Sequence, residues 1–302
     1  MITQIRINNV EPFKNIVWNL KGKHLAIVYG DYMVNKLLFE TLKFLKSIFN
    51  TNGIHSGFFS KLNPELEFSL ENENYGKTIY KIMLDNKGII EEKLECTLNQ
   101  RKSKVFSRKS NGEIFVNKDV FADSESKKRF KMITSVNINE FKRHSIMNLI
   151  VDIVSKKIEK SYAAEKILNL YTEINLMKLN AFENVVYMNE TDMLRDLLKD
   201  SLEGNISINE HTDVLVNPVL LKNVLEQIEN KITGQLILFS NTLELMEMKT
   251  ARENVYFANY NEVICANKFN FRVFKNNNVK NIYLANKFIP IPQLQLEVLL
   301  KG

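Results

Sequence analysis

The chain has 302 residues, of which 45% are hydrophobic and 25% are charged, and its net charge is +6. This balance excludes a disordered or fibrous protein, and the length allows one large domain or two modest ones. A chain of this length can bury a sizeable hydrophobic core, so its stability requires neither a metal nor a disulfide. The two cysteines, Cys96 and Cys265, lie in apolar surroundings, and we expect two reduced, buried thiols.

The N-terminal segment alternates apolar and polar residues up to Pro12 and lacks the apolar run of a signal peptide. No window of the sequence approaches the length of a membrane span. We therefore expect a cytoplasmic protein with no membrane contact. The basic surplus is compatible with nucleic-acid binding without arguing strongly for it.

The opening of the chain predicts two strands, a buried strand and a helix. Residues 2–8 alternate, residues 16–20 form a second short strand, and residues 24–29 are a nearly continuous apolar run that ends at Gly30. Apolar residues then recur at helical spacing from Leu37 onward and stop before the Asn- and Gly-containing segment that starts at residue 50.

The middle of the chain changes character twice. Residues 65–116 are short alternating segments separated by Asn- and Gly-rich turns, which predicts an antiparallel meander. Residues 117–203 are predicted to be mostly helical, with one continuous helix over 163–180. A Lys-rich cluster at 156–160 is interpreted as the solvated face of a helix.

The C-terminal third returns to alternating strands and helices. Pro218 is expected to open a helix that closes at Gly234. Predicted strands cover residues 204–210, 235–240, 254–258, 262–266 and 281–284. The resulting organisation has three parts: 1–116, the first part of an α/β lobe with a β-hairpin layer; 117–190, a helical insertion; and 191–302, the second part of the lobe.

A candidate phosphate-binding loop lies between the buried strand and the first helix. The pattern GxxxxGK[ST] is matched by Gly30 and Lys36, whereas Asn35 replaces the second glycine and Leu37 replaces the hydroxyl residue. Asn tolerates left-handed backbone geometry better than other residues, so it is the mildest replacement for glycine. Leu37 offers no oxygen to Mg²⁺, which removes a magnesium ligand.

Two further strand ends carry polar residues that could serve the same chemistry. The strand at 206–210 ends in Asn209 and Glu210, where a phosphate-loop enzyme needs Asp for Mg²⁺ and Glu to orient the attacking water. The strand at 235–240 is followed by Asn241. Each of these matches alone is weak, and their order along the chain is what makes them informative.

The order and spacing of these segments resemble the RecF/SMC-like ABC ATPase heads, and within them the ATPase family associated with abortive infection and phage defence. The resemblance runs through HLAIVYGDYMVNKLLFETLKFLKSI, the hairpin segments that follow, ENVVYMNETDMLRDLL, GNISINEHTDVLVNPVLLKNVLEQIEN and QLILFSNTLELMEMKTARENVYFANYNEV. It implies an α/β P-loop NTPase fold of the ABC-ATPase-head type, with an antiparallel β layer and a small helical insertion.

The resemblance also assigns roles to individual residues. It places Gly30, Asn35 and Lys36 in the phosphate loop. Asn209 stands where these ATPases have the aspartate that supports Mg²⁺, and Glu210 stands at the position of the catalytic glutamate, as a remnant of that site. Thr191 is the retained residue of the ABC signature, in which Met188 and Glu190 replace serine and glycine. Asn241 stands where these ATPases have the histidine that contacts the γ-phosphate, and Asn217 replaces another histidine before Pro218.

The combined losses predict a catalytically degenerate protein, a pseudo-ATPase, since phosphoryl transfer depends on electrostatic stabilisation that these replacements remove. No metal and no required cofactor are expected, with room left for ATP bound without efficient hydrolysis. The resemblance implies a structural or regulatory subunit of a phage-defence-like or DNA-maintenance-like assembly, as a homodimer or as a heterodimer with an ATPase paralogue or an effector protein.

Two alternatives stay open on the sequence. One is a divergent but active ATPase, since Lys36 and Glu210 are retained. The other is a nucleotide-independent nucleic-acid-binding scaffold, motivated by three basic segments at 101–102, 127–129 and 142–143, although ordinary surface lysines explain these segments more simply. The four histidines form no metal-binding spacing.

Overall fold

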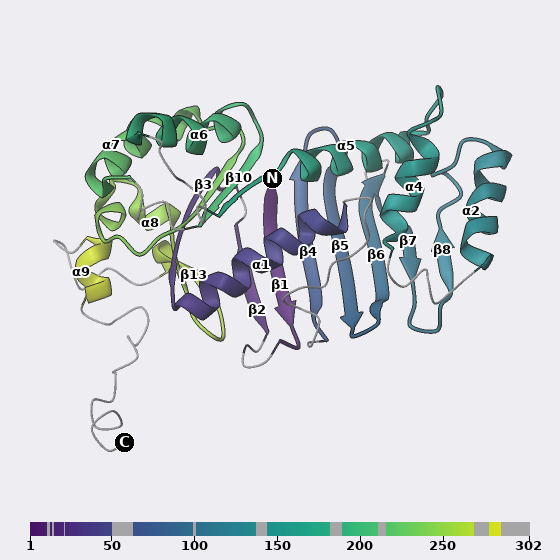
Figure 1. Cartoon of the computed structure of the whole chain (residues 1–302), viewed down its shortest axis with the longest axis horizontal. Helices are drawn as coiled ribbons and strands as arrows, with labels where there is room; N and C mark the ends of the chain where they lie inside the picture. Colours follow the sequence, from purple (N-terminus) through teal and green to yellow (C-terminus); the bar gives the residue numbers. More distant parts are fainter. Residues whose placement is uncertain are drawn as a thin grey trace, which may run out of the picture.

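The computed structural model describes residues 1–10, 13, 15–20, 22–49, 63–98, 101–136, 144–181, 189–210, 216–268 and 278–284. Its core is one mixed sheet in which the strand order is β8-β7-β6-β5-β4-β1-β2-β13-β12-β3-β11-β10-β9. Helices lie along this sheet, and the molecule is elongated along the direction in which the strands follow one another (Figure 1).

One part of the sheet is antiparallel. It contains β1 (Ile2–Asn8), β2 (Ile16–Asn19), β4 (Glu65–Asn72), β5 (Gly76–Asp85), β6 (Gly88–Leu98), β7 (Arg101–Arg108) and β8 (Ile114–Val116). The predicted meander over 65–116 is confirmed, because each of its strands pairs with the next in antiparallel register. The meander is not a separate layer, however: β4 also pairs with β1, so it continues the main sheet.

The other part of the sheet is parallel. It contains β3 (Leu25–Gly30), β9 (Lys178–Ala181), β10 (Ile206–Glu210), β11 (Gln235–Phe239) and β12 (Val255–Ala258). The short strand β13 (Val263–Cys265) joins the two parts, since it is antiparallel to β12 and parallel to β2. The expected strands in these segments are confirmed.

Two hydrophobic clusters explain why the two parts differ in sequence pattern. In β3, Ala26 and Val28 face the first cluster, whereas Leu25, Ile27 and Tyr29 face the second. A strand buried on both faces needs an unbroken apolar run. The strands of the meander have one buried face, so buried and partly exposed residues alternate along β5, for example.

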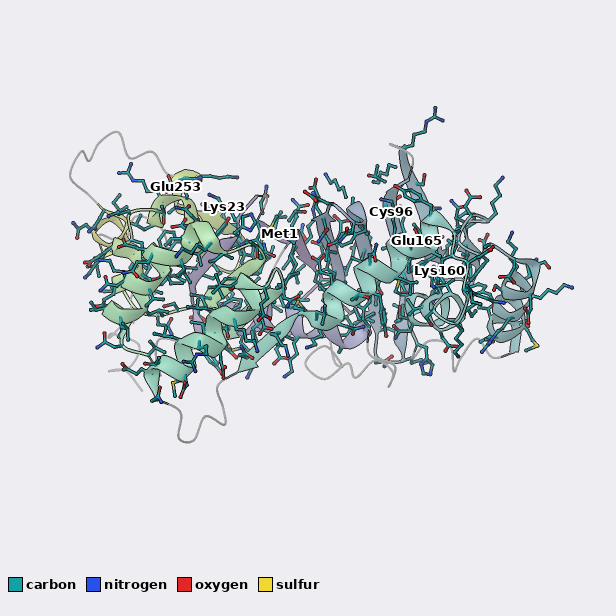
Figure 2. The ribbon with its side chains drawn as sticks, turned by 90° about the horizontal axis from the view of Figure 1, so that it is seen from above. Met1, Lys23, Cys96, Lys160, Glu165 and Glu253 are labelled. Atoms are coloured by element: carbon teal, nitrogen blue, oxygen red, sulfur yellow. The ribbon has the colours of Figure 1, made fainter. Side chains whose placement is uncertain are left out.

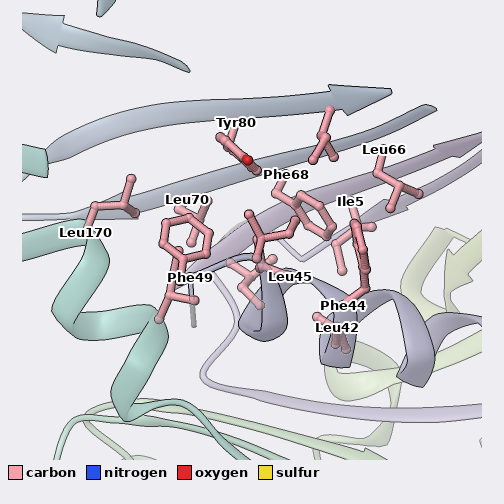
Figure 3. Close-up of a cluster of buried hydrophobic side chains, with 14 of the residues drawn as sticks. Ile5, Leu42, Phe44, Leu45, Phe49, Leu66, Phe68, Leu70, Tyr80 and Leu170 are labelled. Carbon is pink, nitrogen blue, oxygen red and sulfur yellow. The ribbon is translucent and has the colours of Figure 1, made fainter. Parts of the chain in front are cut away.

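The first cluster is built around α1 (Tyr32–Ile48), which crosses the sheet, and α5 (Tyr162–Leu176). In Figure 3, Leu45 of α1 and Phe49 at its end lie against Leu70 and Phe68 of β4 and Tyr80 of β5, and Leu170 of α5 lies beside Phe49 on the same side of these strands. Phe49 lies 5.6 Å from Tyr80 and 5.9 Å from Tyr171, measured between ring centroids. This packing fixes α1 against the antiparallel strands.

The remaining helices complete both ends. At the end that contains β8 lie α2 (Ser124–Val136) and α4 (Ile146–Val154), and α4 buries an apolar stripe of Ile146, Ile150 and Ile153. The second cluster is covered by α6 (Glu190–Leu202), α7 (Pro218–Ile228), α8 (Ala251–Asn254), α9 (Val279–Leu284) and the short turns Glu229–Lys231, Glu244–Glu247 and Ala266–Lys268.

Three secondary-structure predictions are wrong. The helix expected over 163–180 ends at Leu176, because the following residues pair with β10 as strand β9. Residues 279–284 form α9 rather than a strand, with Val279 and Ile282 buried at helical spacing and the Asn278 side chain accepting from the Asn281 N–H. The Lys-rich residues 156–160 lie beyond the end of α4 and are not helical.

Other expectations concern single residues. Trp18 is buried and packs edge-on against Phe239 and Tyr256. Both cysteines are buried and unpaired, as expected. The helix that begins at Pro218 ends at Ile228, six residues before Gly234. The expectations for Met188 and for the basic segment at 142–143 lie outside the described residues.

Candidate functional site at the strand ends

The turn between β3 and α1 contains only Asp31. The helix begins at Tyr32, so the four residues between Gly30 and Asn35 are not an open loop but the cap and first turn of α1. Asp31 is the N-cap: its Oδ1 accepts the backbone N–H of Met33 at 2.8 Å, and its carbonyl oxygen accepts the N–H of Asn35 at 2.9 Å. An Asp at this position also places negative charge at the positive end of the helix dipole.

Gly30 and Asn35 fit together tightly. A Cβ at Gly30 would lie 2.8 Å from the Ala258 carbonyl oxygen of β12 and 2.8 Å from Oδ1 of Asn35. Asn35 is 5% exposed; its amide nitrogen lies 3.4 Å from the Gly30 carbonyl oxygen, and its Oδ1 has no hydrogen-bond partner in the described structure. Gly30 is required here by close packing, and the Asn35 side chain fills the space beside it.

Lys36 lies in the second turn of α1 and turns back toward Tyr32. Its Nζ lies 3.5 Å from the Tyr32 hydroxyl and 5.6 Å from the centre of the Tyr32 ring. Leu37 is fully buried in the first cluster. The position that would hold a magnesium-binding hydroxyl therefore contributes to the core instead.

Asn209 is fully buried in β10, and its side chain is used within the protein. Its Oδ1 accepts from the Asn180 side chain at 2.7 Å, and its Nδ2 donates to the Ser207 hydroxyl at 3.0 Å. Asn180 belongs to β9, so the two amides link neighbouring parallel strands. Sequence reasoning missed Asn180 because it assigned the residue to a helix.

Glu210 is the last residue of β10, and Asn241 follows β11. In the parallel register Glu210 is level with Phe239, which is level with Val28. With strands about 4.8 Å apart, the backbones of β10 and β3 are separated by about 10 Å, since β11 lies between them. Asn241 lies next to β3, because Ser240 before it donates to the Val28 carbonyl and Tyr29 donates to the Thr242 carbonyl.

Thr191 is exposed in the first turn of α6. The N-cap there is Asn189, whose Oδ1 accepts the N–H of Asp192 at 2.9 Å. Glu190 and Asp192 both lie in this first turn, and Asp192 also pairs with Arg195 at 2.8 Å. As at α1, the helix start is surrounded by its own carboxylates.

The structure thus brings the predicted residues of three strands to one edge of the sheet. Gly30, Glu210 and Asn241 lie at or after the carboxyl ends of β3, β10 and β11, which is where open α/β sheets bind ligands. Sequence reasoning did not single out Asp31, although an Asp directly before a helical apolar pattern is a recognisable N-cap signal.

A second polar cluster is buried far from this edge, between the meander and α4. The side chain of Glu92 in β6 accepts from Tyr80 at 2.9 Å, from Arg108 at 3.1 Å and from the Ile146 N–H at 2.9 Å, and also from the Ser145 hydroxyl. Burial and the neighbouring Glu92 charge raise the pKa of Tyr80 well above its usual value. The cluster joins three strands to the start of α4.

The described ranges hold no group of three His, Cys, Asp or Glu side chains that could bind a metal ion. Of the helices that the structure describes, none has the length and apolar character needed to cross a membrane.

At a coarse level, the fold and these residues define a mixed α/β protein built on one large sheet, with polar side chains gathered where its parallel strands end. No protein family model matches the chain, and no curated protein matches it.

Solved structures similar to the chain include two SMC heads and a RecF protein. An SMC head bound to the C-terminal winged-helix domain of ScpA is 11% identical, covers 87% of this chain and 97% of its own, and has a TM-score of 0.43. An SMC head with an extended coiled coil, bound to the C-terminal domain of ScpA and derived from Pyrococcus furiosus, is 9% identical, covers 87% of this chain and 95% of its own, and has a TM-score of 0.40. The recombination mediator protein RecF with ATP is 9% identical, covers 87% of this chain and 98% of its own, and has a TM-score of 0.40.

Proposed function

We propose that this protein is a catalytically degenerate ABC-type ATPase-like protein that acts as a structural or regulatory subunit. The proposal combines the resemblance in the sequence with a buried strand, a helix and an acidic strand end that share one edge of a sheet. The partner is a second copy, an ATPase paralogue or an effector protein, in a phage-defence-like or DNA-maintenance-like assembly.

The observation that carries the proposal is the capped start of α1. A phosphate loop binds its ligand with backbone N–H groups that are free at the start of a helix. Here the Asp31 carboxylate occupies that position and accepts the Met33 N–H, while the Asn35 N–H is committed to the helix. A phosphate placed there would meet a carboxylate, which opposes its binding.

The other candidate residues support the same conclusion. Asn209 lacks the charge of an aspartate, and both ends of its amide are already bonded to Asn180 and Ser207. Leu37 is buried in the core and Lys36 turns toward Tyr32. Little of the electrostatic machinery for phosphoryl transfer is therefore free to act on ATP.

Nucleotide titration tests the proposal. We expect millimolar Mg²⁺–ATP to leave the melting temperature unchanged and to yield no phosphate release above background, because a ligand raises the melting temperature only when it binds the folded state. Lys36→Ala is the matched variant and should behave as the wild type does in both assays. Mg²⁺-dependent phosphate release that disappears in Lys36→Ala would show an active ATPase instead.

The proposed subunit role is tested separately. Size-exclusion chromatography with light scattering, on the protein alone and mixed with the products of neighbouring genes, should reveal a homodimer or a hetero-complex. A protein that stays monomeric in every mixture would contradict the role, whatever the outcome of the nucleotide assays.

A further inference from the structure

One segment of the chain has a large excess of basic residues. Residues 101–136 contain ten Lys and Arg and four Asp and Glu, an excess of six that equals the net charge of the whole chain. This segment forms β7, β8 and α2, which lie together at one end of the elongated molecule (Figure 1). That end of the molecule therefore carries a local excess of positive charge, remote from the ends of the parallel strands.

The outer side of α2 carries much of this charge. Lys127, Lys128 and Lys131 are exposed, and the exposed Ser124 and Ser135 continue the same stripe at helical spacing. The opposite side of the helix is buried through Phe130, whose ring lies 5.3 Å from that of Phe121. We call Ser124, Lys127, Lys128, Lys131 and Ser135 the α2 stripe.

Neighbouring cations are neutralised, whereas those of the stripe are not. Arg129 pairs with Asp152 at 3.6 Å, and Lys157 pairs with Glu125 at 3.0 Å and with Asp123 at 3.6 Å. Within the described ranges, no carboxylate lies within ion-pair distance of the three stripe lysines. The nearby carboxylates thus pair with Arg129 and Lys157, and the stripe lysines form a positively charged surface.

Further cations surround the stripe at the same end. Lys104 of β7 lies 5.5 Å from the ring of Phe115, which is 46% exposed on the edge strand β8. Lys118 is exposed in the connection from β8 to α2. Figure 2 shows the length of the molecule from a second direction, with Lys160 toward this end and Glu253 toward the other.

We propose that the α2 stripe binds the phosphate backbone of a nucleic-acid duplex. Lys127 and Lys131 are one turn apart, about 6 Å along the helix axis, and can therefore reach separate phosphates of a strand that presents one about every 3.4 Å. The serines at both ends add neutral donors of the kind that contact phosphates. The site depends neither on nucleotide nor on the strand ends, so it goes beyond the proposed subunit role.

A duplex fits this surface better than an acidic protein does. Protein interfaces have a core of large apolar or aromatic side chains. In the described part of α2, Met132 is the one large apolar side chain that is exposed. The other exposed residues of the helix are Lys, Ser, Glu and Arg. A surface of charge and hydroxyl groups without an apolar centre is suited to a polyelectrolyte.

Fluorescence anisotropy with a short labelled DNA duplex tests the proposal on the full chain. Three phosphate contacts predict a log–log salt slope of about −2.7, hence a loss of affinity of roughly 40-fold between about 50 and 200 mM salt. The triple variant Lys127→Glu, Lys128→Glu, Lys131→Glu should lose binding at the lower salt concentration. Its melting temperature, measured in parallel, shows whether the variant is folded.

A matched variant separates the stripe from net charge. Lys231→Glu, Lys249→Glu, Lys268→Glu changes the same number of exposed lysines by the same charge at the other end of the molecule, and it should retain binding within a few-fold. Equal loss in both variants would overturn the proposal, since binding would then follow net charge alone. No binding to duplex at low salt, or binding to polyglutamate that duplex cannot displace, would overturn it as well.

Discussion

Two segments that each contribute strands and helices to the fold differ sharply in their balance of basic and acidic residues. Residues 101–136 hold ten basic and four acidic residues, whereas residues 189–268 hold seven basic and thirteen acidic ones. In the acidic segment Glu247 pairs with Lys222 and Lys280, and Glu229 accepts from Thr250 and Asn254. In the basic segment the α2 stripe faces outward without such partners.

The difference shows why a modest net charge says little by itself. In the acidic segment, Glu229 and Glu247 hold short turns and helices next to the parallel strands. The basic segment has cations left over after its internal pairs are made. A partner responds to such a local surplus rather than to the sum over the chain.

Removing the buried Arg108–Glu92 pair at the basic end should cause the largest loss of stability. Arg108→Ala leaves the Glu92 carboxylate buried without its cation, and loss of one partner of a buried pair costs about 3–5 kcal/mol. The free energy of unfolding from urea titration measures this loss. The loss in unfolding free energy should be nearly independent of salt concentration, because salt screens buried pairs much less than surface pairs.

Lys109→Ala is the control for Arg108→Ala. Lys109 is one residue further along the chain, and its pair with Glu113 is 59% exposed on both sides. Its removal should not change stability measurably, because exposed pairs contribute little. If Arg108→Ala proved as harmless as Lys109→Ala, the buried cluster would not be what attaches α4 to the meander.

The strand-end region is expected to respond to packing rather than to charge. Gly30→Ala should destabilise the protein by about 1–3 kcal/mol, the usual cost of overpacking, since the new methyl meets Ala258 and Asn35 at 2.8 Å. Adding Asn35→Ala should recover part of that loss, because it removes one of the two obstacles. A double-mutant cycle in thermal unfolding measures the coupling, and strict additivity would mean that the two residues do not share the space.

The smallest expected effect concerns the cysteine of the meander. Burial raises the pKa of Cys96 to about 11 from an ordinary value of 9.0. The folded protein therefore holds this proton to higher pH than the unfolded chain does, so the associated stability is complete below about pH 9 and is lost as pH rises toward 11. Cys96→Ala should flatten the pH dependence of unfolding in that window, and an unchanged profile would contradict the prediction.

Sequence patterns were sufficient for most strands and for the site residues on them. Alternation identified the meander, and the apolar runs before Gly30, Asn209 and Ser240 identified strands buried on both faces. They could not identify β9, whose four residues follow a helix without a break in pattern and form a strand only because β10 is available to pair with them.

The same limit applies to the candidate site. The sequence by itself determined which residues stand at Gly30–Leu37, Asn209, Glu210 and Asn241, and so which ligands of Mg²⁺ and phosphate are missing. The tertiary structure decided that α1 starts at Tyr32 with Asp31 as its cap, and that Asn209 is bonded to Asn180. A motif gives residue types in order, whereas the start of a helix and the partner of a buried amide depend on which groups the folded chain places nearby.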